Sequence, residues 1–183
     1  NKESLTIKAV NNEYITAVGQ NSPAAAANVG RGHTLPIVQV DEIAHIKFID
    51  VALKALLPAT TTASDIARLA NAPYGKVFTT TAAKLDTESG KFVYNEFYMK
   101  GAAWSEKLFD AEDEEELHKL VRNSSVNDSL VVVLDFNHRQ LGFTDEWLRD
   151  RIRESSSDKI NAEIDYLNKW SRGSSSSPLS PDA

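Results

Sequence analysis

Apolar and polar residues follow one another along the chain in short runs that predict strands separated by helices. Five runs combine apolar and β-branched residues between turn-forming residues, namely 4–10, 13–19, 37–40, 75–82 and 129–136. The first two flank Asn11-Asn12 and predict a hairpin. The later runs alternate with helical segments, which predicts an α/β fold with a mostly parallel sheet covered by helices on both faces.

Helical spacing and capping residues indicate where the helices lie. Ser22 and Pro23 suit the N-cap and the first position of a short helix, which ends at Gly30-Arg31-Gly32. Apolar residues over 46–59 share one face of a helix that ends at Pro58, and Ser64 is expected to cap a second helix over 60–72. Four more helices are predicted at residues 89–104, 111–124, 144–155 and 158–170, and Thr144 is expected to be the N-cap of the third.

Composition excludes several classes of site. The 183 residues carry a net charge of −6, which argues against a broadly basic surface for nucleic acid. There is no cysteine, so disulfides and thiolate metal sites are excluded. The longest apolar runs fall short of the roughly 18 residues that a membrane helix needs. A hydrophobic share of 42% is enough to form a core.

Two predicted strands end in side chains that can do chemistry. Asp41 and Glu42 follow one strand directly, and Thr79, Thr80 and Thr81 end the next. Ligands of parallel sheets bind outside the carboxyl ends of the strands, where an Asp holds Mg²⁺ and a following Glu accepts a proton from water in nucleoside triphosphate hydrolysis. An apolar strand ending in Asp-Glu is the Walker B pattern. The alternative interpretation is an acidic N-terminus of the next helix, stabilised by the helix dipole.

The order of four motifs resembles the ATPase domain of the large terminase subunit of tailed bacteriophages. Upstream of the Asp-Glu strand stands "NSPAAAANVGRG", and the threonine strand continues as "VFTTTAAKLDTESGKFVYNEF". The chain closes with "HRQLGFTDEWLRD" and "INAEIDYLNKW", which are similar to the helices that end that domain. The resemblance covers roughly residues 19–170 and rests on order and spacing, because no single motif decides it.

The resemblance implies a role for each matching residue. Asp41 matches the Mg²⁺-coordinating acid of a P-loop NTPase-like core, and Glu42 matches the catalytic glutamate. The threonines 79, 80 and 81 match the motif that couples the γ-phosphate to motion, unless they are a run of strand-forming residues. Arg31 matches an arginine that in some terminases acts on the ATP of the neighbouring subunit. A guanidinium there would neutralise charge on the transferring phosphoryl group. The other interpretation of Arg31 is a surface arginine on a glycine turn.

The same resemblance implies the function and the partners. Residues 1–170 would be part of an ATPase domain, and 171–183 a Ser/Pro-rich linker towards a nuclease domain, so that the full-length protein is also an endonuclease. ATP and Mg²⁺ would be the cofactors. Double-stranded DNA, the portal protein, the small terminase subunit and further copies in a ring on the procapsid would be the partners. The expected place is the host cytoplasm, at the portal, with no membrane.

The chain departs from the family at the phosphate-binding loop. Neither Gly75-Lys76 nor Gly90-Lys91 has the spacing and the following Ser or Thr of a Walker A motif. We therefore expect this chain to be the second half of an ATPase domain, and to bind ATP poorly alone. Two other functions stay open: another DNA-directed Walker B ATPase, such as a helicase or recombinase fragment, and a non-catalytic α/β binding module in which Glu42 tolerates substitution.

Other ionisable residues show weaker patterns. Asp135 follows an apolar run and imitates a metal acid of a ribonuclease-H-like nuclease, but an ordinary strand-end acid fits better because no second acid matches. The four histidines have no metal-ligand spacing: His33, His45, His118 and His138. The acidic run 112–116 is interpreted as a solvated helix start that would repel DNA.

Overall fold

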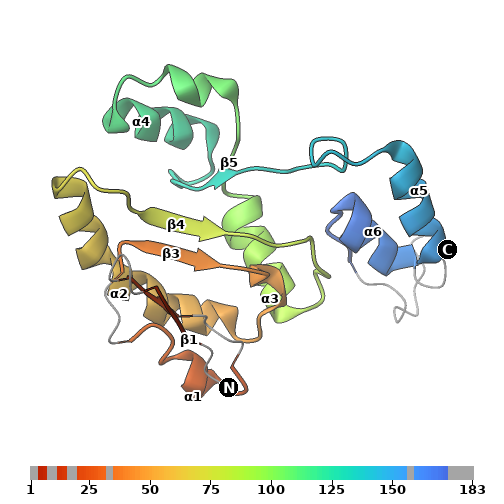
Figure 1. Cartoon of the computed structure of the whole chain (residues 1–183), viewed down its shortest axis with the longest axis horizontal. Helices are drawn as coiled ribbons and strands as arrows, with labels where there is room; N and C mark the ends of the chain where they lie inside the picture. The colour runs from red at the N-terminus through yellow and green to blue at the C-terminus, as the bar shows by residue number, and fades with distance from the viewer. Residues whose placement is uncertain (1–3, 8–11, 16–19, 32–34, 156–158, 173–183) are drawn as a thin grey trace. The chain divides into compact units, whose positions relative to one another are not determined.

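The computed structural model describes residues 4–7, 12–15, 20–31, 35–155 and 159–172 (Figure 1). The chain separates into two compact units, residues 1–80 and 81–183. Within the described residues, no helix is long and apolar enough to cross a bilayer. Most of the expected linker over 171–183 lies outside the described residues.

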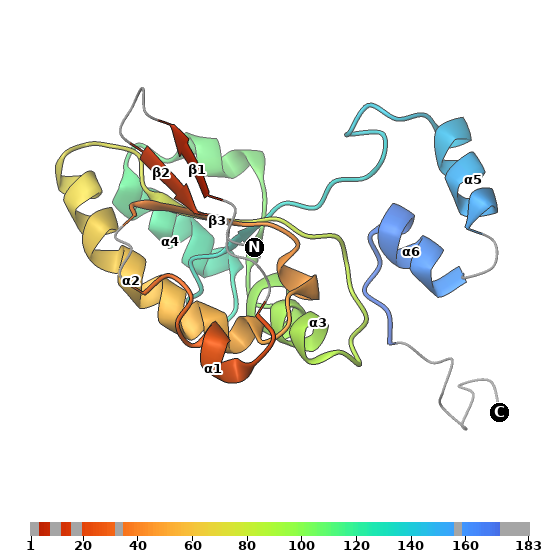
Figure 2. The ribbon, with the colours of Figure 1, turned by 60° about the horizontal axis from the view of Figure 1, so that its bottom comes forward.

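The first unit begins with the predicted hairpin and the predicted short helix. Strands β1 (Ser4–Ile7) and β2 (Asn12–Ile15) pair antiparallel, with Ser4 opposite Ile15. In α1 (Pro23–Ala26), the Ser22 hydroxyl accepts a hydrogen bond from the Ala25 amide at 3.2 Å, as expected of an N-cap. The short helix packs beside α2 (Ile49–Leu69) in both ribbon views (Figures 1 and 2).

A parallel strand pair forms the centre of this unit. Strand β3 (Ile37–Val40) pairs with β4 (Gly75–Phe78), with Ile37 opposite Gly75 and Val40 opposite Phe78. Helix α2 connects the two strands, as a parallel crossover requires. Val38 and Val40, which alternate along β3, are buried. Ile49 and Leu53 of α2 are buried as well.

Helix α2 corrects the expectation of two helices separated at Pro58. It runs without interruption from Ile49 to Leu69 with Pro58 inside it. Its buried positions continue on one face past the proline: Ile49, Ala52, Leu53, Thr60, Ala63 and Ala67. Burial of that face outweighs the local cost of a proline. Ser64 is no cap, because its hydroxyl donates to the Pro36 carbonyl oxygen at 3.2 Å and ties the helix to the start of β3.

The second unit is mainly helical. Helix α3 (Glu88–Val93) is capped by Thr87 and continues as the π-helical turn η3 (Tyr94–Tyr98). The 3₁₀ turn η4 (Glu106–Asp110) and α4 (Glu114–Ser124) follow. Helix α5 (Asp145–Glu154) is capped by Thr144, as predicted, and α6 (Lys159–Leu167) packs on α5.

Two predictions in the second unit are wrong in extent. The helix expected over 89–104 ends at Tyr98, and strand β5 (Ala102–Ala103) follows it. The strand expected over 129–136 pairs only as β6 (Val132–Val133), parallel to β5. Gly101 explains the change, because a Cβ there would lie 2.5 Å from the Val133 side chain, so the two backbones meet where only glycine fits.

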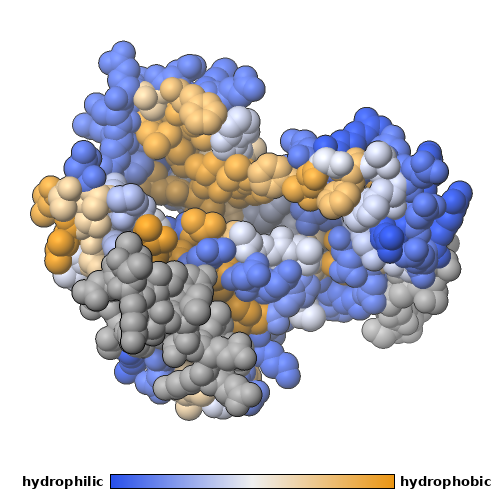
Figure 3. Space-filling view, in the orientation of Figure 1, coloured by the Kyte–Doolittle hydropathy of each residue, from blue (hydrophilic) through white to orange (hydrophobic). Residues whose placement is uncertain are grey.

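The sheet is also smaller than expected. The described strands form three separate two-stranded sheets, β1–β2, β3–β4 and β5–β6, rather than one sheet covered on both faces. The coarse α/β class holds, since two of the three pairs are parallel and helices separate the strands. Apolar side chains stay exposed after β6, at Leu134 and Phe136, and orange marks such residues along this connection in Figure 3.

Candidate functional site

The carboxyl ends of β3 and β4 bring the predicted acids and threonines together. The Thr79 amide donates to the Val40 carbonyl oxygen at 3.0 Å and continues the strand pairing by one residue. The Thr79 hydroxyl donates to Asp41 Oδ1 at 2.5 Å. The apolar runs that end in polar residues predict adjacent and parallel strands with Asp41, Glu42 and Thr80 at one edge, and the pairing of β3 with β4 confirms this.

Two further hydrogen bonds join the turn after β3 to the threonine run. The Ile43 amide donates to the Thr79 carbonyl oxygen at 3.1 Å, and the Ala44 amide donates to Thr80 Oγ1 at 3.2 Å. Ile43 and Ala44 are each only 1% exposed, so the turn is anchored in the core while the acids before it face solvent. The edge is therefore held by backbone as well as side-chain bonds.

Glu42 has an unusual backbone. It lies in the left-handed region at φ 53° and ψ 39°, directly before the 3₁₀ turn η2 (Ile43–His45). L-residues with a side chain rarely adopt this conformation, which costs roughly 1–2 kcal/mol. The side chain is exposed, and His45 Nε2 lies 3.7 Å from its Oε2. Sequence reasoning missed His45 as a neighbour of Glu42, although the spacing of three residues is a usable signal.

The oxygen atoms at this edge suit a metal ion that takes one carboxylate from the protein and keeps water and phosphate oxygens as its other ligands. Within the described residues, no three Asp, Glu or His side chains gather closely enough to enclose a metal. Mg²⁺ in phosphoryl-transfer sites is typically held by one or two carboxylates, with water and phosphate oxygens completing the shell. Asp41 can supply that single carboxylate, because its hydrogen bond to Thr79 occupies only Oδ1.

No described hydrogen bond or ion pair joins Arg31 to Asp41 or Glu42. It is exposed on the turn after α1, where its amide donates to the Asn28 carbonyl oxygen at 3.3 Å. Gly30 before it has φ 75°, and a Cβ there would lie 2.4 Å from Leu56 Cδ1. The turn is thus set by glycine, but no hydrogen bond or ion pair with a described residue holds the guanidinium.

The remaining predicted residues have other positions. Thr81 is the first residue of the second unit, so it belongs to a different unit from Asp41, Glu42, Thr79 and Thr80. His118 lies 3.8 Å from Glu114, and His138 lies 2.8 Å from Asp145, so these histidines pair with carboxylates. His33 lies outside the described residues.

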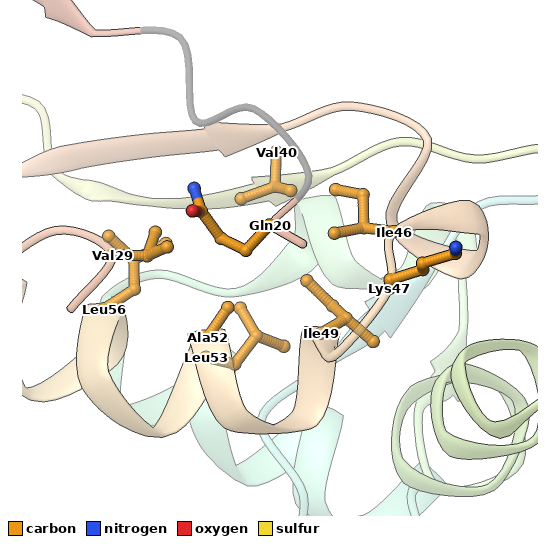
Figure 4. Close-up of a pocket in the computed structure, with 9 residues that line it drawn as sticks. All are labelled: Gln20, Val29, Val40, Ile46, Lys47, Ile49, Ala52, Leu53 and Leu56. Atoms are coloured by element: carbon orange, nitrogen blue, oxygen red, sulfur yellow. The ribbon is translucent and has the colours of Figure 1, made fainter. Parts of the chain in front are cut away.

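A small cavity lies behind the strand pair. It measures about 20 Å³, about the space of one water molecule, and is lined mainly by apolar side chains such as Val40, Ala52 and Leu53 (Figure 4). A nucleotide cannot enter such a space. Asp41 and Glu42 do not line this cavity and are exposed, so the open edge of the strand pair is the place where a ligand can reach them.

Comparisons with protein-family models, with curated proteins and with solved structures find no match for this chain.

Proposed function

We propose that this chain is the part of an ATP-hydrolysing motor subunit that carries the metal-binding acid, the catalytic glutamate and the coupling threonines. The motor would drive viral double-stranded DNA into the procapsid. The observation that carries the proposal is the hydrogen bond from the Thr79 hydroxyl to Asp41 Oδ1, at the common end of two parallel strands. It supports the proposal because a carboxylate suited to Mg²⁺ and a hydroxyl are in contact at the common end of the strands, and ligands of parallel sheets bind outside that end.

Asp41 and Glu42 divide the chemistry between them. Asp41 would hold Mg²⁺ of the Mg²⁺–ATP complex, and the bound ion would neutralise charge on the phosphates. Glu42 would orient a water molecule and take its proton. The Asp41 carboxylate accepts a hydrogen bond from Thr79, whereas Glu42 Oε2 lies 3.7 Å from His45 Nε2, and these different neighbours support different roles for the two acids.

Thr79 and Thr80 would link the nucleotide to the rest of the protein. The Thr79 hydroxyl contacts the metal-ligand acid, and the Thr80 hydroxyl accepts the Ala44 amide behind it. A change in charge at Asp41 therefore alters the hydrogen bonding of the strand end that continues into the second unit. ATP binding also needs a phosphate loop, which residues 1–183 do not contain.

The terminase resemblance supplies the proposed partners. These are double-stranded DNA, the portal protein, the small terminase subunit and further copies of the subunit in a ring. The acidic start of α4, with Asp113 as N-cap and three Glu residues in the first turn, is unsuited to contact DNA. DNA would bind elsewhere on the subunit.

Metal dependence of ATP turnover in the protein that carries this segment tests the proposal. Asp41→Asn keeps the shape of the side chain but removes the charged ligand. We expect the Mg²⁺ concentration for half-maximal turnover to rise more than about tenfold. Thr79→Val should cause a smaller rise, and Thr62→Val, on an exposed turn of α2, should cause none. Unchanged turnover and metal dependence in Asp41→Asn would favour the non-catalytic binding module.

A further inference from the structure

The segment after the threonine run is held by the last described residues of the chain. We name residues 168–171 the strap. Ser171 forms a parallel bridge with Lys84. The Leu85 amide donates to the Ser171 carbonyl oxygen at 2.7 Å, and the Ser171 amide donates to the Ala83 carbonyl oxygen at 3.3 Å. The strap thus pairs with residues 82–85 like a short strand.

Asn168 connects the strap to a third segment. Its side-chain oxygen accepts the Ala82 amide at 2.8 Å, across 86 positions of sequence. Its side-chain nitrogen donates to Asp135 Oδ1 at 2.7 Å. Its backbone is left-handed, at φ 49°, a conformation that asparagine tolerates better than most residues. One side chain therefore bonds both the segment after the threonines and the end of the 129–136 run.

Asp135 and Trp170 connect the strap to η3. Asp135 Oδ2 accepts the Tyr98 hydroxyl at 3.2 Å. The Trp170 ring lies 5.3 Å from the Tyr94 ring and 5.5 Å from the Tyr98 ring, centre to centre. Burial of Tyr98 and its bond to Asp135 raise the pKa of this phenol, in keeping with a protonated hydroxyl that donates.

Two of the residues that the strap bonds are buried, so loss of a bond there would leave a polar group without a partner and without water. Ala82 is 1% exposed and Ala83 is 2% exposed. A buried amide without a partner destabilises the fold. The Ala82 amide receives its partner from a side chain, so a single substitution at Asn168 removes that bond without altering the backbone of any strand.

We propose that Asn168 is a positioning residue that transmits movement of the threonine run to the second unit. The two units join at the Thr80–Thr81 peptide bond, and Ala82 is the second residue beyond it. A displacement of Thr79 and Thr80 reaches the second unit through the chain at Ala82, where Asn168 passes it to Asp135 and the strap. The proposal rests on the proposed motor function, and it assigns to Asn168 the coupling of hydrolysis to movement rather than hydrolysis itself.

A charge swap tests this role in the protein that carries the segment. Asn168→Asp keeps the left-handed backbone and the acceptor for Ala82, but sets a carboxylate against that of Asp135. The double variant Asp135→Asn with Asn168→Asp rebuilds the pair with donor and acceptor exchanged. We expect the single variant to lower the DNA length moved per ATP by about fivefold or more, and the double variant to restore most of it. Asn127→Asp, which adds a carboxylate at another left-handed and exposed position, is the control for the added charge.

Amide hydrogen exchange distinguishes a structural role of Asn168 from a role in coupling hydrolysis to movement. Asn168→Gly removes both side-chain bonds at a position that accepts glycine, and should speed exchange at the Ala82 amide about tenfold or more. Faster exchange with unchanged DNA movement per ATP would overturn the coupling role and leave a structural strap. A lack of rescue by the double variant would overturn the pairing. If the unsubstituted protein hydrolyses no ATP, the proposed function fails and the coupling role falls with it, whatever the exchange result.

Discussion

Glu42 is the residue at which backbone strain and proposed chemistry coincide. A glycine would adopt φ 53° at no steric cost, yet the chain has a glutamate there. Unfavourable backbone conformations of this kind concentrate at functional sites, where the surrounding structure maintains them. Here the buried Ile43 and Ala44 and their bonds to the threonine run maintain it.

Substitutions at Glu42 should reveal the strain directly. Glu42→Gly relieves the left-handed backbone, whereas the matched variant Glu42→Ala retains the strain and also lacks the carboxylate. We expect the glycine variant to be more stable than the alanine variant by about 1 kcal/mol, because relief of roughly 1–2 kcal/mol exceeds the added entropy of the unfolded chain. Denaturant unfolding measures the difference. An alanine variant as stable as the glycine variant would show that the turn is not strained.

At the scale of elements, local signals predicted the starts of α1 and α5, and tertiary packing decided the rest. The hydroxyl caps Ser22 and Thr144 lie where the sequence placed them, since a cap depends only on the next three residues. The prediction that a helix ends at Pro58 was wrong, because buried residues on both sides of the proline stabilise α2.

Strand partners were harder to predict than strands. The pairing of 37–40 with 75–78 followed from two apolar runs that end in polar residues, and so did the position of the acids and the threonines at one edge, whereas the hydrogen bond between Asp41 and Thr79 was not predicted. The short pairing of β5 with β6 and the bond of Asn168 to Ala82 could not be predicted, because each joins residues far apart in sequence without a local pattern.

Helix α2 gives a prediction about Pro58. Proline has no amide hydrogen, so the Lys54 carbonyl oxygen receives no helical bond from it. The Thr60 and Thr61 hydroxyls donate to the Leu57 carbonyl oxygen, at 2.9 and 3.2 Å, and so do not replace the bond that Lys54 lacks. Pro58→Ala at this exposed position should raise the free energy of unfolding by about 1 kcal/mol or more. A lower midpoint in thermal unfolding would instead show that the proline rigidifies the unfolded chain more than it weakens the helix.

The start of α5 gives a prediction about acid. Asp145 accepts hydrogen bonds from Arg139, at 2.7 Å to Oδ1, and from His138 at 2.8 Å. The Arg139 bond, then the His138 bond, hold the pKa of Asp145 well below its usual range. A lowered pKa in the folded state gives stability that is present above the unfolded pKa of about 4 and is lost as pH falls through the folded pKa.

Unfolding of Asp145→Asn measured against pH checks this. The unsubstituted protein should be the more stable at pH 7, and its advantage should shrink below about pH 4 and in high salt, because the group is exposed. A constant difference between pH 7 and pH 2 would mean that the charge of Asp145 contributes nothing.

At the scale of the whole molecule, the proposed function assigns Arg31 to the assembly rather than to the single chain. It is exposed and makes no side-chain bond to a described residue, which suits a group that acts on a neighbouring subunit's nucleotide. Arg31→Ala and Glu42→Gln should each reduce turnover. A mixture of the two variants should regain part of it, because some interfaces then join an intact Arg31 to an intact Glu42. No regain in mixed rings of folded subunits would assign Arg31 to its own subunit or to the turn alone.

The central claim is that Glu42 takes the proton of the attacking water at the edge formed by β3 and β4. The most direct measurement compares ATP binding and single-turnover hydrolysis in Glu42→Gln and in the unsubstituted protein that carries this segment. Glutamine keeps the shape of the side chain and removes the base. We predict unchanged ATP affinity and a hydrolysis rate lower by about 10²–10⁴-fold. A rate within about threefold of the unsubstituted protein, at equal affinity, would contradict the claim, since such a change is too small for loss of a general base.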